Sequence, residues 1–236
     1  MKGFKGFDKD LRCHGMQYAI RETAKHSGTM RMCNSGLHFV EHPLDALTYY
    51  PLHKDSRYAE IEADGVSSET ERDSKRVAQS LIVTAELKIP ALIKAAVEFT
   101  FQKAKPTTGD SAHSATTGDS ARSATTGDSA HSATTGYAAH SATTGCFAHS
   151  ATTGYAAHSA TTGRFAHSSA LGKNTIAAAL GYNSKARGAK GSFLVLAEYK
   201  NDGVTVKAVG VAQVRGKIRP DTWYALKNGK FTEVPE

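Results

Sequence analysis

The chain has 236 residues, 40% of them hydrophobic, and a formal net charge of +7. No stretch approaches the roughly 18 consecutive apolar residues of a membrane helix, and the initial segment MKGFKGFDKDL lacks the apolar core of a secretory signal. No basic cluster interleaves with aromatic residues, which speaks against dedicated nucleic-acid binding. The cysteines, Cys13, Cys33 and Cys146, form no CxxC pair, so we expect no disulfide framework and a cytoplasmic protein.

Residues 1–105 are expected to form a mixed α/β domain. Three segments have the β-branched and aromatic composition of strands: 36–40 (GLHFV), 56–63 (SRYAEIEA) and 81–89 (LIVTAELKI). Pro43 and Pro90 begin the segments PLDALTYY and PALIKAAVEFTFQKA, and proline is favoured in the first turn of a helix. The region therefore alternates strands with two predicted helices.

Four stretches of this region resemble a family of uncharacterised phage and prophage proteins. They are KGFKGFDKDLRCHGMQY (2–18), CNSGLHFVEHPLDALTYYP (33–51), SRYAEIEADG (56–65) and DSK (73–75). The resemblance covers most of residues 1–100. It implies a phage protein that acts in the cytoplasm of a bacterial host, and it implies no established activity.

The segment GLHFVEHPLDALTYY (36–50) also resembles the strand and helix that form part of the nicotinamide pocket in ADP-ribosyltransferases. The resemblance implies a set of site residues: His38 at a position that is usually aromatic, Tyr50 or Tyr49 as the helix tyrosine, Glu60 or Glu62 as the catalytic carboxylate, and Lys5 at the first basic position. NAD would then be the cosubstrate, and otherwise we expect no cofactor. The alternative is a structural strand–helix pair with both tyrosines in the core.

Several cysteine and histidine side chains in this region are of the types that bind zinc. They are Cys13, His14, Cys33, His38 and His42. Their spacing matches no known zinc motif, and a single cysteine or histidine beside a strand is usually packed against it. We therefore predict no metal site.

Residues 106–190 contain a nine-residue repeat. Glycine recurs every nine residues from Gly109 to Gly181, and the consensus unit is G-x-x-A-H-S-A-T-T. A flexible linker has to keep only its amino-acid composition and tolerates insertions of single residues. A stack of strands requires the exact nine-residue spacing that this segment has. The repeat therefore predicts an ordered β-solenoid.

Two repeat units are expected to form one turn of the solenoid, because residue types recur every eighteen positions. This spacing would stack Tyr137 on Tyr155 and Phe147 on Phe165 along two edges of the coil. Alternation places the third, fifth and seventh positions after each glycine inward and the fourth outward. About four and a half turns result.

The fourth position places a ladder of histidines on one outward face: His113, His131, His149 and His167. His140 and His158 would lie on the opposite face with Arg122. Neighbouring imidazoles repel when charged, which predicts lowered pKa values along the ladder. We take this ladder, with Tyr137 and Tyr155, as the candidate binding surface. Metal binding, pH sensing and drift of a duplicated solvent-facing position remain open.

Residues 191–236 are expected to form two hairpins that cap the solenoid. Their turns are Asn201-Asp202-Gly203 and Asn228-Gly229, and Asn-Gly is a strong signal for a two-residue hairpin turn. The fold class is therefore an α+β N-terminal domain (1–105), a β-solenoid of about 18 residues per turn (106–190) and a β-hairpin cap (191–236).

The sequence favours a binding protein over an enzyme, because no complete catalytic set is present. The repeat, ending in SSALG and AAALG, resembles the heads of trimeric bacterial and phage adhesins in composition and glycine phase, which implies a homo-oligomer. Our leading hypothesis is a phage-encoded accessory protein that engages and inhibits a bacterial host factor, such as a defence component, through protein interaction. The alternatives are a virion fibre or adhesion component and an ADP-ribosyltransferase-like enzyme.

Overall fold

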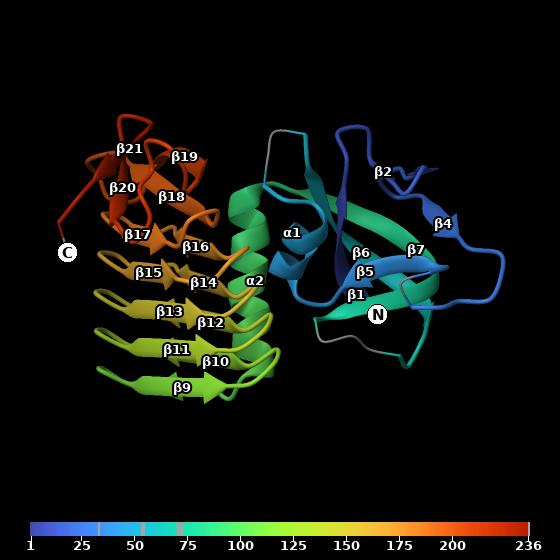
Figure 1. Ribbon diagram of the computed structural model, residues 1–236, viewed down its shortest axis with the longest axis horizontal. Helices are drawn as coiled ribbons and strands as arrows, with labels where there is room; N and C mark the ends of the chain where they lie inside the picture. Colours follow the sequence, from blue (N-terminus) through green and yellow to red (C-terminus); the bar gives the residue numbers. More distant parts are fainter. Residues whose placement is uncertain (33, 53–54, 70–72, 236) are drawn as a thin grey trace. The chain divides into compact units, whose positions relative to one another are not determined.

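The computed structural model describes residues 1–32, 34–52, 55–69 and 73–235. The chain divides into two compact units, Met1–Ala96 and Val97–Glu236, which are described separately (Figure 1). In the described parts of the chain, no helix has the length and apolar character that crossing a membrane requires.

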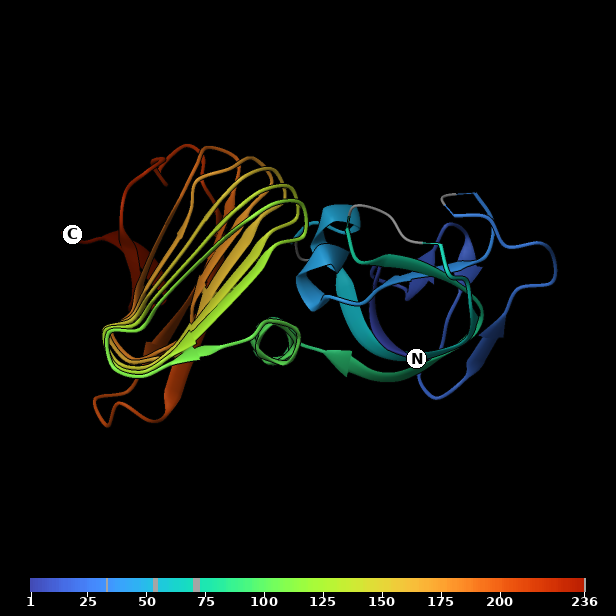
Figure 2. The same cartoon turned by 90° about the horizontal axis from the view of Figure 1, so that it is seen from below.

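The first unit is built on an antiparallel sheet with the strand order β4-β7-β5-β1-β6. Its strands are β1 (Lys2–Phe7), β4 (Thr23–Lys25), β5 (Leu37–Val40), β6 (Arg57–Val66) and β7 (Lys75–Leu87), and a small hairpin joins β2 (Arg12–Cys13) to β3 (Met16–Gln17). Strand β7 pairs with both β5 and β6. The strands β7, β5, β1 and β6 therefore form a closed circuit of pairings, which curves around a core in Figure 2.

The core of this unit contains large side chains from four of these strands. Phe7, Leu37, Phe39, Ile61 and Val83 are all almost fully buried in one cluster. Burying side chains of this size contributes about 1.5–3 kcal/mol each, so the sheet has its own hydrophobic stabilisation.

Before the repeat, the described residues contain three helical segments. The predicted helix at Pro43 is a 3-10 turn, η1 (Pro43–Asp45), followed by a single α-turn, α1 (Ala46–Tyr49). The predicted helix at Pro90 is α2 (Ile89–Lys103), with Pro90 in its first turn. The boundary between the two compact units falls within α2.

Residues 107–196 form a β-solenoid of about five turns with about 18 residues per turn, which confirms the predicted coil. Two parallel sheets face each other (Figures 1 and 2). The β9 sheet contains β9 (His113–Thr117), β11 (His131–Thr135), β13 (His149–Thr153), β15 (His167–Ala170) and β17 (Lys185–Gly188). The β10 sheet contains β8 (Thr107–Thr108), β10 (Arg122–Thr126), β12 (His140–Thr144), β14 (His158–Thr161), β16 (Ile176–Ala179) and β18 (Phe193–Tyr199).

The solenoid interior is filled by the small residues at the third, fifth and seventh positions of each unit, as predicted. The serines at the fifth position of successive units lie on the two facing sheets in turn. Their hydroxyl groups form hydrogen bonds with one another inside the coil. Ser132 donates to Oγ of Ser123 (2.7 Å), Ser141 donates to Oγ of Ser132 (2.9 Å), and Ser150 donates to Oγ of Ser141 (2.9 Å). This serine ladder joins the sheets at a spacing that larger side chains would not allow.

The corners of the coil follow one backbone pattern. The second residue after each repeat glycine has φ between 48° and 58°, in the left-handed region. These residues include Ser129, Ala138 and Phe147 in the early and middle turns and Asn174 and Asn183 in the last turns. Asparagine tolerates this conformation better than serine, alanine or phenylalanine do, so the middle turns store more backbone strain than the last ones.

The two C-terminal hairpins continue both sheets and cap the coil. Strand β18 adds to β16 in parallel register, and β19 (Val206–Gln213) returns antiparallel to it. The second hairpin, β20 (Tyr224–Lys227) and β21 (Lys230–Glu233), joins the β9 sheet through the pair Ala186 and Tyr224. Large side chains such as Leu194, Leu196 and Leu226 complete an apolar cluster over the alanines of the last turn.

Candidate functional site

The outward side of the β9 sheet forms a flat exposed surface, which we call the His face. It consists of nine residues: His113, Ala115 and Thr117 on β9, His131, Ala133 and Thr135 on β11, and His149, Ala151 and Thr153 on β13. The strands pair in parallel register without a shift, so equivalent residues of successive turns lie side by side. Eight of the nine are exposed and His149 is half-buried.

The histidine ladder runs along this face and continues to His167. The ring centroids of His113 and His131 are 4.9 Å apart, those of His131 and His149 are 4.8 Å apart, and both pairs are stacked. His167 meets His149 edge to face and contacts Trp223 of the C-terminal hairpin at 5.3 Å between centroids. The four sequence-predicted ladder residues are therefore neighbours in space.

Three histidines of the ladder, His131, His149 and His167, resist protonation. Burial, and to a smaller extent the neighbouring imidazole, lowers the pKa of His131 and of His149. The same causes, together with Lys185, lower the pKa of His167 to about 4. The direction agrees with the sequence prediction, but loss of hydration is the larger cause and repulsion between rings the smaller one.

On the β10 sheet the fourth position differs from the solvent-facing prediction. His140 and His158 are each only 2% exposed, with ring centroids 5.4 Å apart. The side chain of Arg122, the first member of this row, lies over the ring of Phe99 at 5.5 Å. Alternation gave the correct direction for these side chains, but not their burial.

The predicted aromatic edges are present. The rings of Tyr137 and Tyr155 stack with centroids 5.6 Å apart, and those of Phe147 and Phe165 stack at 5.1 Å. The hydroxyl of Tyr155 accepts a hydrogen bond from Asn174 Nδ2 (2.6 Å). Tyr155 and Phe147 remain exposed at the two edges.

The first unit contains a cavity of about 420 Å³. His38 on β5, Tyr50 after α1 and Lys5 on β1 all line it, and Tyr49 lies beside them. The backbone of β1 approaches Tyr50 closely, because a Cβ at Gly6 would lie 2.6 Å from Cδ2 of that ring. The sequence-predicted positions 5, 38 and 50 are therefore brought together.

Glu60 and Glu62 lie on β6, and neither is among the residues that line this cavity. Glu60 forms an ion pair with Lys2 (2.9 Å). The implied catalytic carboxylates are thus not cavity-lining residues, although Glu60 lies opposite Phe4 in the pairing of β1 with β6.

Residues 1–95 match the family model described as a domain of unknown function (DUF7666). The match therefore includes all the residues that line the cavity and ends before the repeat begins. No curated protein and no solved structure matched the chain.

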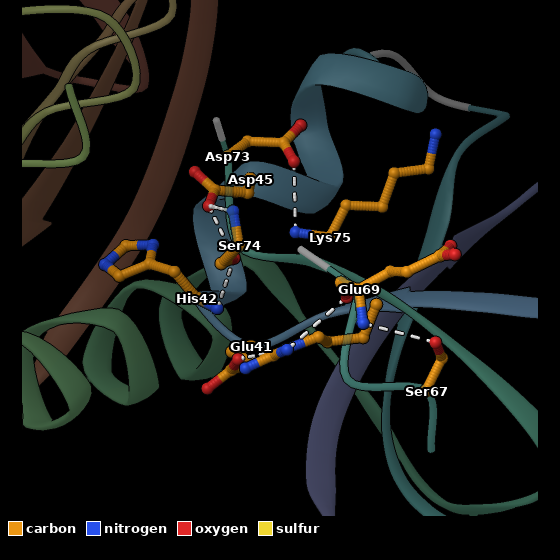
Figure 3. Close-up of polar contacts among 9 residues, drawn as sticks. Glu41, His42, Asp45, Ser67, Glu69, Asp73, Ser74 and Lys75 are labelled. Carbon is orange, nitrogen blue, oxygen red and sulfur yellow. Dashed lines mark hydrogen bonds and ion pairs between the residues drawn. The ribbon is translucent and has the colours of Figure 1, made fainter. Parts of the chain in front are cut away.

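A polar network supports one wall of the cavity (Figure 3). Ser74 is its centre: its Oγ accepts from the backbone N–H of His42 (2.8 Å) and donates to Oδ2 of Asp45 (2.5 Å). Asp73 accepts from the backbone N–H of Lys75 (3.0 Å) and from the hydroxyl of Tyr49. The segment 73–75 is therefore held against η1 and α1, which positions Tyr49 and Lys75 at the cavity.

A second part of the network lies nearby in Figure 3. Arg76 Nε donates to Oε1 of Glu41 (2.6 Å). The backbone N–H of Glu69 donates to Oγ of Ser67 (3.2 Å), which holds the turn that follows β6. The ion pair between Arg76 and Glu41 links β7 to the residue that follows β5. It thereby holds in place the short segment that leads from β5 into η1.

The zinc-type residues do not form one group. Cys13, His14 and His38 line the cavity, His42 lies in the network around Ser74, and Cys33 lies outside the described residues. Lys75 and Tyr18 are cavity residues that sequence reasoning missed. The DSK motif at 73–75 was the available signal for Lys75, since it stood out without an assigned role.

Proposed function

We propose that the protein works by binding a partner protein through the His face. The observation that carries this proposal is the exposed, in-register array of His, Ala and Thr on three adjacent strands of the β9 sheet. A flat, rigid and repetitive surface suits recognition of another folded protein, because little side-chain or backbone entropy is lost on binding.

The ladder favours an uncharged surface at neutral pH. The lowered pKa values keep His131 and His149 neutral there, and the alanine and threonine rows carry no charge. Charged residues are depleted at the centre of protein interfaces, so this composition supports a protein partner more than a nucleic acid or an acidic ligand.

The partner that we propose is a bacterial host protein, such as a defence factor, that is inhibited on binding in the host cytoplasm. The support is the resemblance of residues 1–100 to phage and prophage proteins. A virion fibre or adhesion component is the structural alternative, and it would place the same surface in a permanent assembly.

The experiment is an affinity capture from bacterial lysate with the full chain, followed by identification and reconstitution of the captured protein. Ala133→Arg and Ala151→Arg together should abolish capture, because they place two large cations in the middle of the His face. Thr162→Arg, at an exposed position after β14, is the matched control and should retain the partner. Equal capture by both variants would show that the His face is not the binding surface.

The enzyme alternative is supported by one observation, the gathering of Lys5, His38 and Tyr50 around one cavity. Its test is incubation of the full chain with labelled NAD and lysate. Transfer of label that disappears in the Glu60→Gln, Glu62→Gln double variant would support it. The binding function is favoured because neither glutamate lines the cavity.

A further inference from the structure

The cavity of the first unit is lined by several basic side chains. Two lysines and three histidines line it: Lys5, Lys75, His14, His26 and His38. All its lining residues are in the described part of the chain, and none of them is an aspartate or a glutamate. A partly enclosed site with two lysines and no carboxylate among its lining residues favours the binding of anions.

Lys5 is the most unusual of these residues, because it is only 5% exposed on a central strand of the sheet. Its Nζ donates to the backbone oxygen of His38 (2.5 Å) and lies 5.3 Å from the ring centroid of Tyr18. The thiol of Cys13 is its other polar neighbour. Burial disfavours the charged form of Lys5, and no carboxylate lines the cavity to compensate it, so a structural role alone explains Lys5 poorly.

These basic groups line one cavity and influence one another's protonation. Burial lowers the pKa of Lys5, the neighbouring Cys13 acts in the opposite direction, and Lys75 lowers the pKa by a smaller amount. Burial also lowers the pKa of His38, and Lys75, Lys5 and His14 act in the same direction. A bound anion would relieve this mutual repulsion.

Aromatic rings line the same cavity beside the cations. Tyr18, Phe39, Tyr49 and Tyr50 are among its walls, and Lys75 Nζ lies 4.6 Å from the ring centroid of Tyr49. Aromatic walls favour a planar apolar group, whereas the lysines favour a group with more than one negative charge. The volume, about 420 Å³, lies within the range of about 300–1,000 Å³ that is usual for small-molecule sites.

We propose that this cavity binds a nucleoside phosphate, with the phosphate held by Lys5 and Lys75 and the base against the tyrosines. This site is separate from the His face, and the proposal goes beyond the protein-binding function. It assigns a ligand-binding role to the DUF7666 region, which ends before the solenoid begins.

The test is calorimetric titration of the full chain with AMP, with adenosine and inorganic phosphate as partial ligands. AMP should bind at least about tenfold more tightly than either partial ligand. Lys5→Met should weaken AMP binding by at least about tenfold, the effect of losing one hydrogen bond to a charged group. Lys2→Met is the matched control: it lies on the same strand, its side chain is exposed and pairs with Glu60, and AMP affinity should be unchanged.

Lys75→Met gives an independent check if Lys5→Met fails to fold, because the Lys75 side chain lies beside Tyr49 rather than within the central strand. It should weaken AMP binding to a similar extent. The proposal would be overturned by no binding of AMP at millimolar concentration, or by equal affinity for AMP and adenosine or for AMP and phosphate. It would equally be overturned if Lys2→Met weakened AMP binding as much as the cavity variants.

Discussion

The imidazole rings of His131 and His149 lie parallel, 4.8 Å apart between centroids, because β11 and β13 pair residue for residue in parallel register. The spacing is that of neighbouring strands, so the backbone ladder alone fixes it. Each ring shields the face of the next from water. The same register therefore creates the flat His face and makes its protonation unfavourable.

We predict that acid destabilises the solenoid between pH 7 and pH 5. The folded-state pKa values of His131, His149 and His167 are lowered, that of His167 to about 4, whereas unfolded histidines titrate near their ordinary value of about 6.5. In this window the unfolded chain binds more protons, so the free energy of unfolding falls as the pH falls. Thermal unfolding in a pH series should show a decreasing Tm.

The matched comparison is the His149→Gln, His167→Gln double variant. Its Tm should fall less between pH 7 and pH 5 than that of the unmodified chain, since two of the disfavoured protonation events are gone. A pH dependence unchanged by the double substitution would show that other groups govern acid stability.

A second prediction concerns the corner glycines. Gly145 and Gly118 have φ of 139° and 123°, a region that strains other residues by about 1–3 kcal/mol. A Cβ at Gly145 would also overlap the backbone oxygen of Gly127 in the turn before it, whereas a Cβ at Gly118 would meet nothing within 4 Å. Gly145→Ala should therefore lower the free energy of unfolding clearly more than Gly118→Ala does, as measured in urea.

Because each turn of a solenoid contacts only its neighbours, the Gly145 change should also open the middle of the coil to protease. Equal protease resistance and equal stability of the two variants would contradict the ordered stacking on which the His face depends.

The solenoid could be predicted from sequence because its contacts repeat with a fixed sequence separation. The stacking of Tyr137 on Tyr155 corresponds to an eighteen-residue period that is plain in the amino-acid sequence. The hairpin turn at Asn228 was predicted from local chemistry. Asn174 and Asn183, at the second position after glycine, were an unused signal for the left-handed corner residue.

Less of the first unit could be predicted from the sequence, because its residue contacts do not recur at a fixed sequence separation. Strand β7 begins at Lys75 rather than at residue 81, since its first residues pair with β5, far away in the sequence. Strand β1 was not predicted: its glycines weaken the strand signal, and its central place between β5 and β6 stabilises it instead. The cavity depends on both strands, so Lys5 was indicated only through the resemblance to ADP-ribosyltransferases, and its burial on a central strand was not predicted.

A third prediction concerns self-association. Strand β19 is the last strand of the β10 sheet, and four valines on or next to it are unusually exposed: Val204 (79%), Val206 (50%), Val209 (37%) and Val211 (40%). An apolar edge strand of this kind favours pairing with another strand. Light scattering should therefore detect a homo-oligomer, and Val206→Lys with Val211→Lys should shift it toward the monomer. A monomeric unmodified chain at micromolar concentration would contradict this prediction.

The last prediction separates the two kinds of hydroxyl inside the coil. Ser141 donates to Oγ of Ser132 and accepts from Ser150, both at 2.9 Å, so Ser141→Ala breaks the serine ladder and leaves a buried donor unpaired. We expect a loss of about 1–3 kcal/mol in the free energy of unfolding. Thr143, two residues along the same strand, has a buried Oγ1 without a hydrogen-bond partner among the described residues. Thr143→Val keeps the shape and removes this unpaired hydroxyl, so it should leave stability unchanged or raise it by about 1 kcal/mol. Urea unfolding of the two variants measures both effects, and a Thr143→Val loss as large as that of Ser141→Ala would show that the interior is hydrogen-bonded in a different way.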